Sequence, residues 1–194
     1  MHAVVRQAPL LGLVFLLLAP PGLAGAVRAE VDELGQQEAG QQEAGQRQVG
    51  RAAPDLSLPA LRSNAEPIDL ADHRGKVVFV DFWSSWCAPC RRAMPRLDAL
   101  RREFRRDGFE VIGVNVDLEP DAARRFLERT RVDYPLAADP GGEAANRFGV
   151  AVLPALVVVD RRGIVQHALT GRALEAPGLL RSTLQDLLAE EEVR

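Results

Sequence analysis

The stretch KVVFVDFWSSWCAPCRRAMPRL, residues 76–97, joins a continuous apolar run to a segment with helical spacing and carries both cysteines of the chain. Residues 76–83 hold one acid, Asp81, among apolar side chains, as is typical of a central strand that is buried on both faces. Residues 91–106 repeat apolar side chains at helical spacing and end just before Gly108, a common stop signal for a helix. We therefore expect a buried strand, a short turn with the cysteines, and a long helix.

The remaining elements alternate in the same way. They are a strand at 109–117, a helix at 121–132, two strands at 155–160 and 164–171 around a tight turn, and a closing helix at 175–188. Upstream, two short alternating segments at 55–61 and 67–70 predict a small leading hairpin. This order predicts an α/β fold with a central mixed β-sheet flanked by helices and an N-terminal β-hairpin.

The first residues have the parts of a secretory signal. Arg6 precedes an apolar run from Pro9 to Ala19, and small residues at 24–26 form an AxA-like cleavage site. Residues 1–29 are predicted to be a signal peptide, with cleavage favoured, or otherwise an N-terminal membrane anchor, because residues 7–27 carry no charge. The mature protein is then expected in the bacterial periplasm or anchored to the outer face of the inner membrane, and it meets the membrane only if this segment is uncleaved.

Residues 30–50 differ in composition from the rest of the chain. QQEAG occurs twice between 36 and 45, and apolar side chains are few. Such a segment buries too little surface to offset its conformational entropy, so we predict a low-complexity flexible linker. Residues 51–194 are predicted to form the folded domain.

Charge excludes one class of partner. The net charge is -3 and the sequence pI is about 5.7, so the chain lacks the basic footprint of a nucleic-acid-binding protein. The arginine-rich stretch from Arg91 to Arg131 is interrupted and flanked by acids, which indicates a solvated helical face. No nucleic-acid partner is expected.

The cysteine pair has four interpretations. Zinc needs about four ligands, and the chain adds only three histidines to Cys87 and Cys90, so no metal is expected. A disulfide across a two-residue gap restrains little loop entropy, which argues against a structural staple. Two incidental buried thiols would need no further explanation. Redox chemistry fits best, because the helix start stabilises a thiolate at Cys87 and places Cys90 one turn inward to resolve a mixed disulfide.

The segment at 76–97 resembles the active-site segment of the thioredoxin superfamily. Residues 51–194 are similar to its exported TlpA and ResA-like thiol-disulfide oxidoreductases, with further marks at 134–150 and 149–163. The resemblance implies a thioredoxin-like fold, no cofactor, protein thiols and disulfides as substrates, and a membrane thiol as electron donor.

The resemblance also implies roles for residues around the cysteines. Pro154 corresponds to a cis proline that faces the pair and leaves the backbone of Leu153 free to bind a substrate strand; an ordinary strand-entry proline is the alternative. Asp81 corresponds to a buried acid that assists proton transfer to the resolving cysteine, unless it is an exposed acid at a strand edge. Trp86 is expected to form a flat docking surface, although an aromatic there could simply pack.

Two departures and two alternative functions stay open. ResA-like proteins usually carry glutamate where this chain has Ala93, and commonly asparagine at Asp81, which argues against a dedicated role in apocytochrome c reduction. A thiol peroxidase would match Ser84 but would need a proline where this chain has Val80. A non-catalytic adaptor would tolerate loss of both cysteines. The main prediction is an exported thiol-disulfide oxidoreductase, a protein disulfide reductase.

Overall fold

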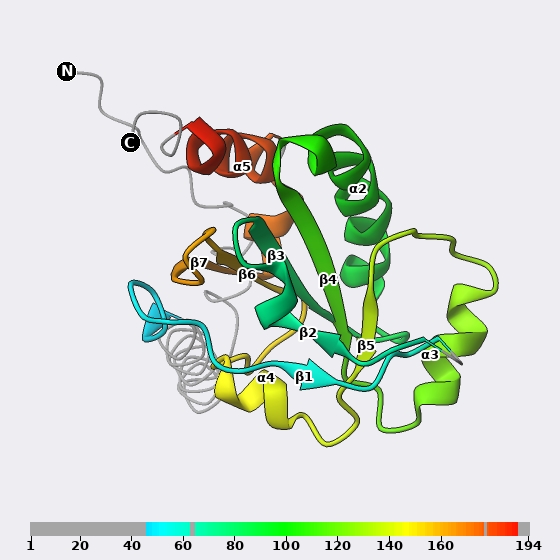
Figure 1. The fold of residues 1–194 in the computed structure, drawn as a ribbon. Helices are drawn as coiled ribbons and strands as arrows, with labels where there is room; N and C mark the ends of the chain where they lie inside the picture. The colour runs from blue at the N-terminus through cyan, green and yellow to red at the C-terminus, as the bar shows by residue number, and fades with distance from the viewer. Residues whose placement is uncertain (1–45, 63–64, 177, 190–194) are drawn as a thin grey trace, which may run out of the picture. The chain divides into compact units, whose positions relative to one another are not determined.

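A five-stranded mixed sheet forms the centre of the computed structural model, which describes residues 46–62, 65–176 and 178–189. Its strands lie in the order β5 (Leu136–Ala138), β4 (Phe109–Asn115), β3 (Val77–Trp83), β6 (Ala155–Val159) and β7 (Val165–Thr170). β3 is parallel to β4 and antiparallel to β6. The predicted central mixed sheet is therefore confirmed, and the strand before the cysteines is its middle strand (Figure 1).

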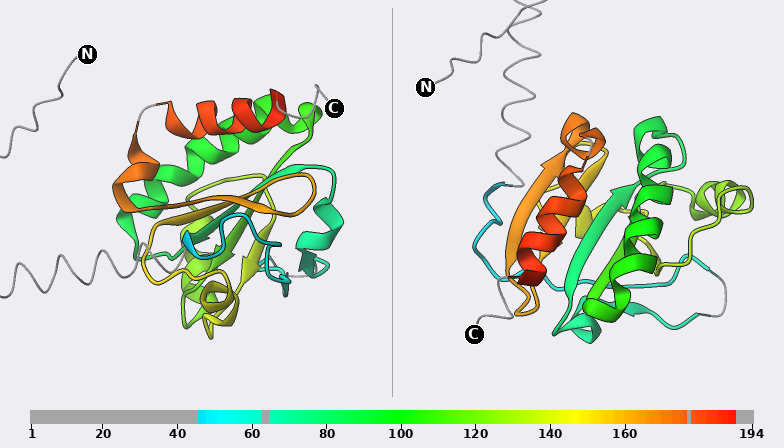
Figure 2. Two further views of the ribbon diagram at one scale, coloured as in Figure 1. Left: turned by 90° about the vertical axis from the view of Figure 1, so that its left-hand side faces the viewer. Right: turned by 90° about the horizontal axis from the view of Figure 1, so that it is seen from above.

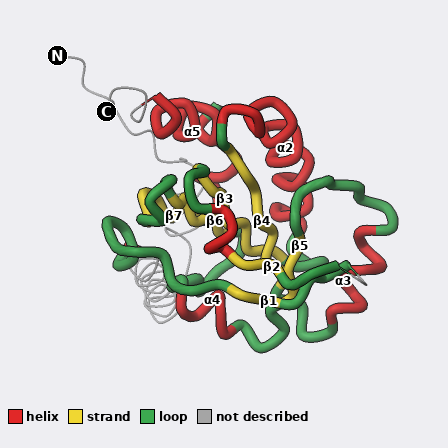
Figure 3. The backbone as a smooth tube through the Cα atoms, viewed as in Figure 1, coloured by secondary structure: helices red, strands yellow, loops and turns green. Residues whose placement is uncertain are grey.

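Helices cover both faces of this sheet (Figures 1 and 3). The long α2 (Ala88–Phe104) and α5 (Leu179–Ala189) lie side by side on one face, as Figure 2 shows. The short α4 (Glu143–Arg147) lies on the other. Alternate β3 side chains divide between two buried clusters: Val77, Phe79 and Trp83 pack with the α2 and α5 side, and Val78, Val80 and Phe82 with the α4 side. This period of two explains the continuous apolar run of the sequence.

Most predicted elements are found, with shifted boundaries. The leading hairpin pairs β1 (Ser57–Leu58) with β2 (Ile68–Asp69) in antiparallel register. The 3-10 turns η2 (Leu70–His73) and η3 (Arg105–Asp107) precede β3 and β4. Gly108 ends the α2 and η3 segment in the left-handed conformation, with φ 87°. α3 (Pro120–Leu127) is shorter than predicted.

Two predictions about the C-terminal half need correction. The closing helix begins at Leu179 rather than at 175, because the 3-10 segment η4 (Gly171–Glu175) and the left-handed Gly178 come first. The segment at 134–150, for which no helix or strand was predicted, contains both β5 and α4. A three-residue strand and a five-residue helix are too short to leave a periodic pattern in the sequence.

The chain before β2 runs along both outer strands of the sheet. On the β7 side the Gly50 amide donates to the Val165 carbonyl at 2.8 Å, and on the β5 side the Leu61 amide donates to the Leu136 carbonyl at 2.7 Å. Isolated bridges at Ala52 and Ala60 belong to the same two contacts. The edge-covering segment, residues 50–61, therefore closes both edges of the sheet.

The predicted leader at 1–29 and most of the predicted linker lie outside the described residues. The last linker residues are described, and the Gln46 side chain donates to the Ala168 carbonyl of β7 at 3.1 Å. Across the part of the chain that the structure describes, we find no helix with the length and apolar character needed to span a bilayer.

Candidate active site

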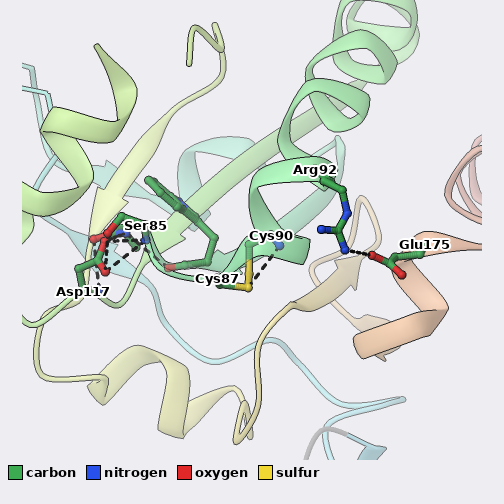
Figure 4. Close-up of a disulfide and its surroundings, with 8 residues drawn as sticks. Ser85, Cys87, Cys90, Arg92, Asp117 and Glu175 are labelled. Atoms are coloured by element: carbon green, nitrogen blue, oxygen red, sulfur yellow. Dashed lines mark hydrogen bonds and ion pairs between the residues drawn. A yellow bond between two sulfur atoms is a disulfide. The ribbon is translucent and has the colours of Figure 1, made fainter. Parts of the chain in front are cut away.

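The two cysteines lie where β3 passes into α2. Cys87 is the N-cap of α2, and Pro89 lies in the first turn. The structure shows the pair as a disulfide with the Cα atoms 5.3 Å apart, and the Cys90 amide donates to the Cys87 sulfur at 3.2 Å (Figure 4). The first amides of a helix have no partners within it, so a thiolate at the N-cap accepts hydrogen bonds at the positive end of the helix dipole.

The cysteines differ in accessibility. Cys87 is 5% exposed and Cys90 is fully buried. An attacking sulfur has to meet a sulfur of another molecule, whereas a resolving sulfur only has to reach its neighbour. The order of burial therefore favours Cys87 as the nucleophile and Cys90 as the resolving cysteine.

Asp81 is fully buried in the middle strand, on the side that α2 covers. Neither carboxylate oxygen has a hydrogen-bond partner among the described residues. Burial without a partner disfavours the charged form and raises the pKa of Asp81 from its usual 3.8 to about 7. The alternative of an exposed acid at a strand edge is therefore wrong, and the group titrates in the range where proton transfer at neutral pH is efficient.

Pro154 follows a cis peptide bond after Leu153 and immediately precedes β6. The side chain of Leu153 is partly buried and packs against the cluster that contains both cysteines. The predicted cis bond is thus present. The role of Leu153 in substrate binding stays a prediction.

Trp86 precedes Cys87 and projects into solvent. Its exposed fraction is 70%, one of the largest among the apolar side chains of the described residues, so the alternative of a packed aromatic is wrong. Leu118, at 83%, is likewise exposed, on the loop that follows β4. An exposed apolar side chain therefore directly precedes the less buried cysteine.

A second buried acid, Asp117, was not predicted from the sequence and holds the loop before the cysteines. Its carboxylate accepts from the Ser85 amide at 2.9 Å, the Ser85 hydroxyl at 3.2 Å and the Asn115 side-chain amide at 2.8 Å (Figure 4). The Val116 amide donates to the Trp83 carbonyl at 2.9 Å. We call these contacts the loop clamp. Polar residues directly after the buried strand at 109–115 were the available signal, because neighbouring parallel strands end at the same edge of a sheet.

In addition to the loop clamp, an ion pair holds the beginning of α2. Arg92 forms an ion pair with Glu175 of η4 at 2.6 Å (Figure 4). Both side chains are well exposed, at 57% and 43%, so the pair orients the groups more than it stabilises the fold. Within the described residues no cluster of three potential metal-ligating side chains is found.

Comparisons with known proteins agree with this geometry. A model of the AhpC/TSA family matches residues 49–168. The chain is similar to the thiol-disulfide oxidoreductase ResA of Geobacillus kaustophilus, with 35% identity over 119 residues that cover 61% of this chain and 67% of the relative. It is also similar to the protein of that name from Bacillus subtilis, with 30% identity over 114 residues and shares of 59% and 64%. The chain thus spans about two thirds of the length of these relatives.

Two solved structures share this fold and have sequence identities of 33% and 28% to this chain. A putative thiol:disulfide interchange protein DsbE from Chlorobium tepidum has a TM-score of 0.66 and 33% identity, covering 72% of this chain and 97% of that one. A putative protein disulfide isomerase from Bacteroides thetaiotaomicron has a TM-score of 0.63 and 28% identity, covering 74% and 92%.

Proposed function

We propose that this chain, which belongs to the AhpC/TSA family, reduces disulfide bonds of other proteins outside the cytoplasm. Its activity class follows from its relatives: it is a thiol-disulfide oxidoreductase. The pair Cys87 and Cys90 is proposed as its reactive group. The observation that carries the proposal is the disulfide at the start of α2, with the more accessible sulfur at the N-cap.

The reaction has two exchange steps. The Cys87 thiolate attacks a substrate disulfide, so that a bond from Cys87 to the substrate forms and one substrate sulfur leaves as a thiolate, which takes a proton from solvent. Cys90 then loses its proton and attacks the Cys87 sulfur, which closes the internal disulfide and releases the second substrate thiolate. The substrate gains two electrons and two protons, and the cysteine pair is oxidised.

Asp81 is proposed as the proton acceptor for Cys90 in the second step. The carboxylate is on the buried side of the sheet with the cluster that contains Cys90, and its pKa of about 7 lets it hold a proton and release it near neutral pH. The protonated acid can then return the proton to the departing substrate thiolate.

Substrate binding is proposed at Trp86, Leu153 and Pro154. The exposed ring of Trp86 offers an apolar platform beside Cys87. The cis proline supplies no amide of its own, so the backbone of Leu153 is the group proposed to pair with an extended substrate segment.

The reducing direction is supported by modest stabilisation of the Cys87 thiolate. The Cys90 amide approaches the Cys87 sulfur, whereas Pro89 has no amide hydrogen to offer. Arg92 is exposed and paired with Glu175, so solvent and its partner both weaken its field at the sulfur. Strong oxidants depend on an extremely stabilised thiolate. The pair is therefore proposed to donate electrons, which a membrane thiol would replace.

Trapping with purified full-length protein tests the proposal. Cys90→Ser, given a disulfide-bonded protein, should accumulate a mixed disulfide through Cys87, whereas the matched Cys87→Ser should not. Wild-type protein supplied as the dithiol should release the substrate as a dithiol and end as the internal disulfide. The reverse trapping pattern would contradict the assigned roles, and a substrate left oxidised by the wild type would contradict the reducing direction.

A further inference from the structure

Three buried polar groups lie on the side of the sheet that α2 covers and take no part in the loop clamp. They are the Asp81 carboxylate, the Trp83 indole nitrogen and the Tyr134 hydroxyl. Each of the three residues is at most 1% exposed, and none of these atoms has a hydrogen-bond partner among the described residues. Buried polar atoms are almost always bonded, so three such atoms in one region require an explanation.

Gly113 brings the three groups together. It is the register partner of Asp81 on β4 and has no side chain. A Cβ atom at this position would lie 3.0 Å from Cε2 of Tyr134 and 3.2 Å from Nε1 of Trp83. Cδ2 of Leu136 would be nearer still, at 2.7 Å. The two rings and Leu136 thus occupy the space that a side chain at 113 would fill, next to the register position of Asp81.

The hydrogen-bonding capacities of these groups are complementary. The indole nitrogen only donates, the tyrosine hydroxyl can donate, and an ionised carboxylate only accepts. Burial, and next the charge of Asp81, raise the pKa of Tyr134, so its hydroxyl keeps its proton throughout the physiological range. One bound water can connect buried groups of this kind where they do not touch.

We propose that Tyr134 is a positioning residue for Asp81, and that with Trp83 it forms a buried hydrogen-bonded unit which stabilises the ionised carboxylate. The unit sets the pH at which Asp81 can accept the proton of Cys90, so the inference rests on the proposed role of Asp81. Burial alone, without the two donors, raises the pKa of Asp81 to about 7, so with the donors it should lie below that value.

Other titratable groups act on Tyr134 less than Asp81 does. The register partners of Asp81 on the two adjacent strands, Gly113 and Leu156, carry no charge. On α2, Cys90 titrates only when the protein is reduced, and the charge of Asp98 acts on Tyr134 after that of Asp81. Arg62 acts on Tyr134 in the opposite sense. Asp81 is thus the leading titratable group that Tyr134 should report.

The single tyrosine of the chain makes a direct test available. In oxidised full-length protein, where the cysteines do not titrate, 13C at Cζ of tyrosine gives one resonance. It should follow a titration with a midpoint between the usual 3.8 of an aspartate and about 7, the pKa that burial alone gives Asp81, and this titration should vanish in Asp81→Asn. A resonance that is flat from pH 4 to 9, or a titration that persists in Asp81→Asn, would overturn the proposal.

Tyr134→Phe removes only the hydroxyl and provides the functional arm. The midpoint of Asp81, followed by 13C at the aspartate carboxyl carbons, should rise toward about 7, by about one unit, equivalent to roughly tenfold. The pH profile of the disulfide-exchange rate should shift to higher pH by the same amount. In the Asp81→Asn background, Tyr134→Phe should leave this pH profile unchanged. An equal shift in both backgrounds would overturn the proposal. The oxidised-state titration needs no turnover, so its failure is distinguishable from a failure of the proposed function.

Discussion

Asp81 and Asp117 are two buried acids near the ends of neighbouring parallel strands, yet their surroundings are opposite. Asp81 is fully buried and its oxygens have no partner among the described residues. Asp117 is 4% exposed and accepts from a backbone amide, a hydroxyl and a side-chain amide. Burial of a carboxylate therefore does not by itself indicate chemistry. Its partners decide whether the group holds the backbone in place or titrates near neutral pH.

The other buried acids of the described residues resemble Asp117. Each accepts at least one backbone amide; they are Asp98, Glu110, Asp139 and Asp160. An unpaired buried acid costs free energy in its charged form, because no hydrogen bond replaces the lost hydration. Among the described residues the other buried acids accept backbone amides and Asp81, on the cysteine side of the sheet, accepts none, so much of that cost remains where proton transfer is proposed.

The largest expected effect that tests the contrast between Asp81 and Asp117 is the effect of Asp81→Asn on the free energy of unfolding. The pKa of Asp81 is higher in the folded protein, at about 7, than its usual 3.8. Its contribution to stability is therefore fully present below about pH 4 and is lost as the pH rises to about 7. Above that, the charged group destabilises the fold by up to about 4 kcal/mol. Denaturant unfolding of the oxidised protein at pH 5 and pH 8 should show that the variant is more stable than the wild type at pH 8. Its free energy of unfolding should also depend less on pH.

The control for this measurement is Asp117→Asn, which alters a carboxylate that already has partners. It should not stabilise the protein at pH 8. If Asp81→Asn lowers stability at pH 8, or keeps the pH dependence of the wild type, the ionised Asp81 is stabilised in solution as well as Asp117 is, and the contrast between them is wrong.

Asp117→Ala is expected to have a smaller effect and to lower the free energy of unfolding. The substitution leaves the part-buried Ser85 amide without its acceptor and the buried Asn115 side-chain amide with only the Trp83 carbonyl at 3.4 Å, which should cost about 2 to 3 kcal/mol of unfolding free energy. Disulfide exchange should also slow, because the loop before Cys87 is no longer held. Thermal unfolding and exchange rates at one pH give both values. A variant as stable as the wild type would show that the loop clamp is not a stabilising contact.

The smallest expected effect is that of Ser85→Ala, which tests whether the loop clamp and the region around Asp81 are energetically independent. Only the hydroxyl contact at 3.2 Å is lost and the amide contact remains, so we expect a cost of about 0.5 to 1 kcal/mol. Combined with Asp81→Asn, the two changes should add within about 0.5 kcal/mol, because the groups share no partner. A larger coupling in the double-mutant cycle would mean that the loop and the buried acid act as one unit.

The sequence was sufficient for the centre of this fold. The apolar run at 76–83, the cysteine spacing and the helical pattern after it predict β3, the turn and α2, because each has a strong local signal. The burial of Asp81 was also predictable from its apolar neighbours.

Contacts between distant segments were not predictable in the same way. Asp117 meets Ser85 only because β3 and β4 are adjacent and parallel. Tyr134 lies in a connection without periodicity, and its place beside Asp81 depends on the absence of a side chain at Gly113. Such features require the register of the sheet, which single-sequence patterns do not contain.

The edge-covering segment has a consequence for how the domain is completed. The chain that covers β7 is joined to partners far along the sequence, with Gln46 and Ala168 122 positions apart. Loop closure over such distances is entropically costly, so these contacts are expected to form after the local ones. The part of the domain that is synthesised first is then the last to be placed. Until it is, both outer strands are open to pairing with a second molecule, and a chain shortened to begin at residue 62 would keep that hazard permanently.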